Sequence, residues 1–87
     1  MNKVLTFSLS YEQMTTTTEQ YISKCIAKAA KLSGLEADIE MDWARAVLVH
    51  WHLLAQVGSA SEAQVEADRL RMIRLIWGSQ TAEEWPC

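Results

Sequence analysis

Two histidines, His50 and His52, are the side chains of this 87-residue sequence best suited to metal or acid–base chemistry. Residues two apart on an α-helix point about 200° from each other, whereas the zinc pattern of metalloproteases needs two histidines four residues apart. His52 belongs to a polar stripe, and we expect His50 to be a core or interface histidine in an apolar arc. If two copies of His50 met across a symmetry axis, association would depend on pH near about 6–7.

The other candidates for chemistry are a cysteine and an acidic run. Cys25 lies among apolar residues with no histidine nearby in sequence, so we expect it to pack in a core. The carboxylates at 36, 38, 40 and 42 lack the glycine turn of a calcium loop and the Glu-x-x-His of a di-iron site. No nucleophile elbow, phosphate loop or dinucleotide fingerprint is present. The sequence therefore predicts no catalytic residue, metal site, cofactor or small-molecule substrate, and a protein that is not an enzyme.

The segment from Asp38 to Val57 predicts one helix that is apolar around roughly 240° of its circumference. Its narrow polar stripe consists of Asp38, Asp42, Arg45, His52 and Gln56, with Val49 among them. A preceding helix is expected from a Thr16–Glu19 capping box to about Ser33, and a following one from a Ser59–Glu62 capping box to about Trp77. Gly58 and Gly78 should end the second and third helices. Short loops favour antiparallel neighbours, so we expect an all-α, three-helix antiparallel bundle.

Residues 3–11 alternate between apolar and polar side chains, which predicts a half-buried strand with Leu5, Phe7 and Leu9 on one face. A single strand cannot satisfy its own backbone groups, so it would pair with a copy of itself or with the sheet of a partner. An extended arm over 1–14, or the start of a helix, is the alternative. We treat 1–87 as a single helical domain whose residues 79–87 form a loose tail.

The composition predicts more apolar surface than so short a chain can bury. Apolar residues make up 49% of the sequence and four of them are Trp, while a domain of this size buries about 60% of its unfolded surface. We expect the surplus to form a partner surface. Its predicted residues are Trp51, Ala44 and Ala55, with Trp77, Trp85 and Arg69 as further contacts. Arg69 would either pair with Glu66 or extend to an interface.

These features favour a small, acidic, non-enzymatic protein–protein interaction module. It would be an oligomeric subunit, most simply a homodimer, or an adaptor or inhibitor that docks on a larger protein; such modules are common among phage and other viral or mobile-element products. The net charge of −3 argues against broad nucleic-acid binding. The N-terminus is a poor signal peptide, and the longest apolar run, 46–55, is too short to span a bilayer. We expect a cytoplasmic protein that does not bind membranes.

The alternative function is a dimeric DNA-binding transcriptional regulator. The stretch 54–65 resembles a helix-turn-helix core, with Ala55, Ser61 and Val65 at the expected spacings and Gly58 one position early. The second template is a ribbon-helix-helix dimer that pairs through the predicted strand. Against the first template, the recognition helix would lead with Glu62 and Glu66, which would repel phosphates. Against the second, a threonine-rich stretch separates the strand from the first helix, and the third helix is extra.

Overall fold

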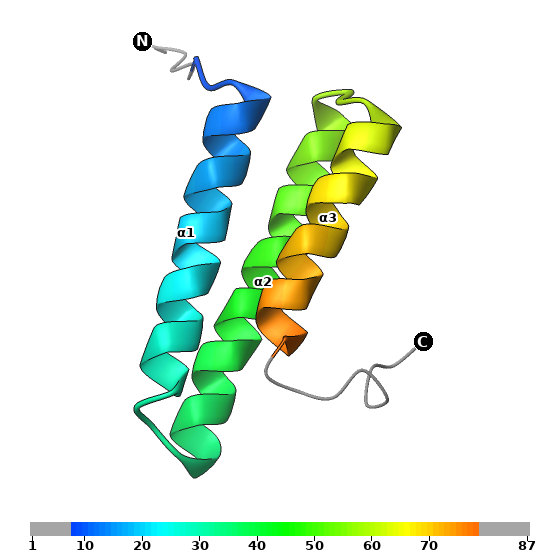
Figure 1. Ribbon diagram of the computed structural model, residues 1–87. Helices are drawn as coiled ribbons and strands as arrows, with labels where there is room; N and C mark the ends of the chain where they lie inside the picture. The colour runs from blue at the N-terminus through cyan, green and yellow to red at the C-terminus, as the bar shows by residue number, and fades with distance from the viewer. Residues whose placement is uncertain (1–7, 79–87) are drawn as a thin grey trace, which may run out of the picture.

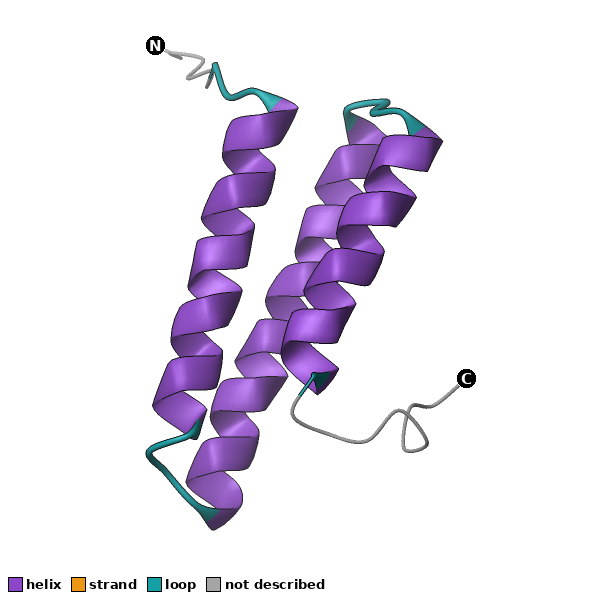
Figure 2. Cartoon of the chain, in the orientation of Figure 1, coloured by secondary structure: helices purple, strands orange, loops and turns teal. Residues whose placement is uncertain are grey.

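The computed structural model describes residues 8–78, which form three helices joined by short loops (Figure 1). These are α1 (Tyr11–Ala29), α2 (Gly34–Val57) and α3 (Glu62–Trp77). Successive helices run in opposite directions, and residues 8–78 contain no strand (Figure 2). The prediction of an all-α, three-helix antiparallel bundle is confirmed. None of the helices in the described part of the chain combines the length and apolarity needed to cross a lipid bilayer.

Helix α1 begins six residues earlier than the sequence pattern predicted. The backbone N–H of Gln13 donates to Ser10 Oγ at 3.0 Å, and the Ser10 N–H donates to Gln13 Oε1 at 2.9 Å. This reciprocal capping box replaces the predicted one at Thr16 and Glu19. The weak helix formers of the threonine run therefore lie inside the helix, where Thr15 is buried and bonded to α2.

The N-terminal arm is correspondingly shorter than expected. Residues 8–10 are not in a strand, and Tyr11, assigned to the strand pattern, is the first residue of α1. Leu9 is exposed. Leu5 and Phe7, the other two residues of the predicted strand face, lie outside the described residues, as does the predicted tail 79–87.

Helices α2 and α3 end at the predicted glycines, but α3 begins at a different residue from the one predicted. Gly58 and Gly78 are the C-caps of α2 and α3, as predicted. Ser61, rather than Ser59, caps α3 by accepting a hydrogen bond from the Gln64 backbone N–H at 3.4 Å. Ser59 has φ +60° where the chain reverses direction, so the N-cap falls two residues later.

The core is assembled from one face of each helix around Trp51. Trp51 is 1% exposed, and its indole Nε1–H donates to Thr15 Oγ1 on α1 at 2.9 Å. Its ring centroid lies 6.2 Å from that of Tyr11. The other core residues are Ile22, Cys25, Ala44, Leu48, Ala55, Val65, Met72 and Ile76. The prediction that Cys25 packs in the core is therefore confirmed.

Cys25 should react slowly with thiol reagents in the folded protein. The residue is 3% exposed, and burial raises the pKa of its thiol, so little thiolate is present and access requires opening of the bundle. In a Cys87→Ser background we expect Ellman's reagent to modify Cys25 about 100-fold more slowly in buffer than in urea. Equal rates in the two solvents would contradict the burial of this side chain.

Candidate interaction surface

Helix α2 carries most of the exposed apolar surface of the described chain. Of the ten large apolar side chains that are exposed, seven belong to α2, and they are 43–83% exposed. At 100° per residue, they project about 90–170° away from the mean direction of the core residues of the same helix. We call this side the outer face of α2; its large apolar residues are Leu35, Ile39, Trp43, Val49, Leu53, Leu54 and Val57.

The outer face has the residue spacing of a coiled-coil seam. Its central stripe consists of Ile39, Trp43, Ala46, His50, Leu53 and Val57, all of them exposed. The steps along this stripe alternate between four and three residues, which is the repeat that keeps one line of side chains against a partner helix. His50 lies within the stripe, so the expectation of a core histidine is wrong, and the expectation of an interface histidine remains a prediction.

Paired charges lie along both borders of the outer face. On the side of α1, Lys28 Nζ lies 3.5 Å from Glu40 Oε2. On the side of α3, Arg45 Nη1 donates to Asp42 Oδ1 at 2.6 Å, and its guanidinium carbon lies 5.2 Å from the ring centroid of Trp77. Residues 46–57 contain no Asp, Glu, Lys or Arg. The C-terminal half of the outer face therefore has no carboxylate, ammonium or guanidinium group.

Three residues predicted to mark the partner surface lie in the core instead. Trp51, Ala44 and Ala55 are each at most 2% exposed, because α1 and α3 together cover this side of α2. A partner cannot contact them in the folded chain, so their assignment is corrected. Trp43, which is 54% exposed and lies about 80° around the helix from Trp51, is the tryptophan of α2 available to a partner.

The remaining predicted contacts divide between α3 and the undescribed tail. Trp77 is partly buried against the core, under Arg45. Arg69 donates to both carboxylate oxygens of Glu66, at 3.0 and 2.7 Å, so the pairing alternative is confirmed for this residue. Trp85 lies outside the described residues.

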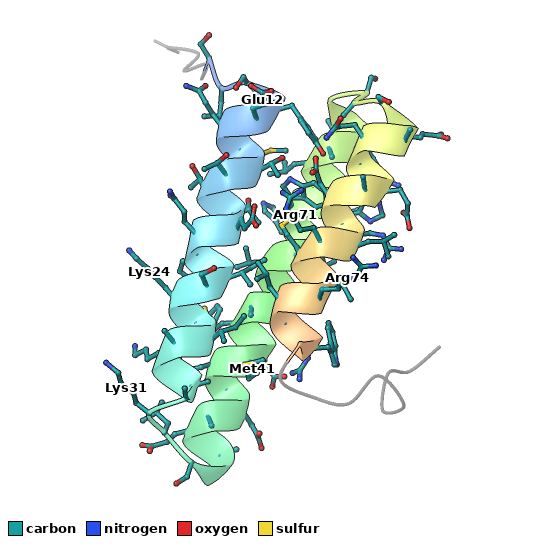
Figure 3. The ribbon with its side chains drawn as sticks, in the orientation of Figure 1. Glu12, Lys24, Lys31, Met41, Arg71 and Arg74 are labelled. Atoms are coloured by element: carbon teal, nitrogen blue, oxygen red, sulfur yellow. The ribbon has the colours of Figure 1, made fainter. Side chains whose placement is uncertain are left out.

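A buried polar cluster lies between α1 and α3, and the sequence pattern did not predict it. Asp68 is 5% exposed, and its carboxylate accepts hydrogen bonds from Tyr11 Oη at 2.6 Å, from Gln64 Nε2 at 3.0 Å and from Arg71. Arg71 also donates to both carboxylate oxygens of Glu19 on α1. Figure 3 shows Arg71 on the side of α3 that faces α1, whereas Lys24 and Lys31 project away from the bundle.

The cluster shifts the ionisation of its members in opposite directions. Burial, together with the hydrogen bond to Asp68, raises the pKa of Tyr11 to about 12. Burial opposes ionisation of Asp68 as well, but the hydrogen bonds from Gln64, Tyr11 and Arg71 outweigh it and lower the pKa of this carboxyl. Of the three donors to the Asp68 carboxylate, Tyr11 joins it to α1, while Arg71 joins α3 to Glu19 on α1. We assign this cluster to the stability of the bundle.

Acid should destabilise the fold through Asp68. Its pKa is lower in the folded state than in the unfolded state, so the unfolded chain takes up the proton first as the pH falls. The stabilisation is thus present above the ordinary pKa of about 4 and is lost on further acidification. Urea unfolding from pH 6 to pH 2 should show this loss, and Asp68→Asn should make it smaller. An equally steep loss in Asp68→Asn would contradict this role.

One open groove contains both a histidine and carboxylates. It measures about 630 Å³ and lies where α2 turns into α3, with His52, Glu62 and Glu66 in its lining. His52 stacks against Trp51, with 6.2 Å between the ring centroids. No group of three or more His, Cys, Asp or Glu side chains within residues 8–78 is arranged to hold a metal ion.

No protein-family model, curated protein or solved structure matches this chain. Its function must therefore be inferred from its own surfaces, among which the outer face of α2 is the most distinctive.

Proposed function

We propose that this protein is a small protein–protein interaction module that docks through the outer face of α2. It would act as an oligomeric subunit, or as an adaptor or inhibitor on a larger protein. The observation that carries the proposal is the exposure of seven large apolar side chains on the outer face of α2. Four of the seven belong to the stripe that has coiled-coil spacing: Ile39, Trp43, Leu53 and Val57. Soluble monomers rarely leave such a continuous apolar patch open to water, and larger patches mark interaction sites.

The chemistry of the outer face favours another apolar helix as its partner. Helix faces of this kind bind through anchors at three- and four-residue steps, and tryptophan is enriched among residues that dominate binding energies. Trp43 is such an anchor, since it is large, exposed and central in the N-terminal half of the stripe. The absence of Lys and Arg over residues 46–57 disfavours phosphate or nucleic acid as the ligand of this face.

Site-specific photo-crosslinking in the cell that naturally makes the protein tests this function. A photoreactive amino acid at Leu53, on the outer face, should give discrete covalent adducts with a protein. The same group at Gln20, on the exposed side of α1, serves as the control. Absence of discrete adducts from Leu53, or the same adducts from both positions, would contradict docking through this face. The mass of the adduct distinguishes a second copy of the chain from a different protein.

A further inference from the structure

We infer that the outer face of α2 is occupied by a second copy of this chain, with the two α2 helices packed antiparallel about a two-fold axis. This inference rests on the proposed docking function and names its partner. Three features of the described residues support it: the symmetry of the stripe, the distribution of charge along α2, and the area of apolar surface.

The stripe is complementary to itself when one copy is reversed. Its six positions are symmetric about residue 48, so a two-fold axis at that level places every stripe residue opposite another stripe residue. Ile39 then lies opposite the partner's Val57, Trp43 opposite the partner's Leu53, and Ala46 opposite the partner's His50. Each layer pairs a larger side chain with a smaller one, as close packing between helices requires. A parallel pair would instead set Trp43 against the partner's Trp43.

The charges of α2 favour the antiparallel orientation. Its four carboxylates, Glu36, Asp38, Glu40 and Asp42, all lie in its N-terminal part, and residues 46–57 contain no Asp or Glu. An antiparallel pair sets the acidic end of each copy beside an end of the other copy that has no carboxylate, and it also opposes the two helix dipoles. A parallel pair would gather eight carboxylates at one end, where like charges repel.

The exposed area matches what a stable dimer needs. Each partner of a standard protein–protein interface loses about 800 Å² of accessible surface. Seven large apolar side chains that are 43–83% exposed along a 24-residue helix supply most of such an area. The paired borders, Lys28 with Glu40 and Arg45 with Asp42, would form the polar rim that surrounds the apolar centre of many interfaces.

Sedimentation equilibrium of the purified full-length chain tests the inference. We expect the wild-type protein to associate to twice the 9.9 kDa mass of one chain as its concentration rises. Leu53→Glu should raise the dimer dissociation constant at least about 100-fold, because it buries two carboxylates in an apolar seam. Leu9→Glu is the matched control, since Leu9 is 59% exposed and Leu53 is 54% exposed, but Leu9 lies outside the outer face. Circular dichroism should show equal helix content in all three proteins.

A wild-type chain that stays at the monomer mass at high concentration would overturn the second copy as the partner. So would a dimer that survives Leu53→Glu or is broken by Leu9→Glu. If the chain is a monomer but Leu53 still cross-links to a different protein in cells, the docking function stands and the second copy is rejected. If there is neither a dimer nor a discrete adduct, both proposals fail.

Discussion

Trp51→Ala should strongly destabilise the folded protein. The substitution empties a fully buried site and removes the hydrogen bond from the indole to Thr15. Large-to-small changes of buried aromatic residues cost about 3–5 kcal/mol. A chain of 87 residues has a total stability of the order of 5–10 kcal/mol, so the loss is a large part of it. Urea denaturation followed by circular dichroism measures the free energy of unfolding.

Trp51→Phe separates the packing of this residue from its hydrogen bond. Phenylalanine keeps much of the apolar volume but leaves Thr15 Oγ1 without its donor, so the expected loss is about 1–2 kcal/mol. If Trp51→Ala instead retained near wild-type stability, Trp51 would not be a core residue. The sequence placed Trp51 on the predicted partner surface, where the same substitution would impair association and leave a folded chain; the burial of Trp51 reverses that expectation.

Trp43→Ala should have the opposite effect, leaving the chain folded and weakening the proposed dimer. Trp43 lies eight residues before Trp51 on the same helix, yet it is 54% exposed and belongs to the stripe of the outer face. Truncation of a central tryptophan anchor costs about 2 kcal/mol or more of binding free energy, which is roughly 30-fold in the dissociation constant. Sedimentation equilibrium measures the association, and urea denaturation at a low protein concentration measures the fold.

Trp43→Ala and Trp51→Ala are matched controls for each other, because both replace a tryptophan of α2 with alanine. Trp43→Ala should lose less than about 1 kcal/mol of monomer stability, as surface substitutions do. A Trp43→Ala protein that unfolds, or one that associates as tightly as the wild type, would contradict the assignment of Trp43 to an interface.

The helices were predictable from the sequence, while their first residues were less so. The apolar repeat and the stops at Gly58 and Gly78 gave all three helices and two of their ends. The start of α1 was misplaced because Tyr11 also fits the alternating pattern of residues 3–11, and that pattern concealed the cap at Ser10. The spacing of nearby residues cannot decide whether Tyr11 belongs to a strand or to a helix. The hydrogen bond from Tyr11 to Asp68 on α3 helps to hold Tyr11 in the helix.

The sequence could not decide which apolar side of α2 is exposed. Projection of α2 gives two apolar sides, and the helical period is the same for both. Which side is covered depends on where α1 and α3 pack. Tyr11 and Thr15 on α1 contact Trp51, and Arg45 reaches Trp77 on α3. These contacts leave Trp43 and its neighbours exposed, and they cover the side of Trp51, Ala44 and Ala55 that was expected to be open.

Asp68 was missed because its type suggests exposure. The residue lies at helical spacing between Val65 and Met72, which are both buried, so its position was a signal that it faces the core. A carboxylate is buried only when donors satisfy it. Those donors come from Tyr11 on α1 and from Gln64 and Arg71 on its own helix, and their convergence is a property of the fold.

The distance between spin labels on two copies of α2 tests the central claim most directly. In a Cys87→Ser background, Asp38→Cys provides an exposed labelling site beside the outer face, while Cys25 remains buried. With a two-fold axis at the level of residue 48, each label lies ten residues from the axis, so the rise of 1.5 Å per residue separates the pair by about 30 Å along the helix. A pulsed dipolar measurement should find a distance of at least that size. A separation well below about 20 Å would indicate a parallel pair, and the absence of any dipolar coupling at high concentration would contradict the dimer.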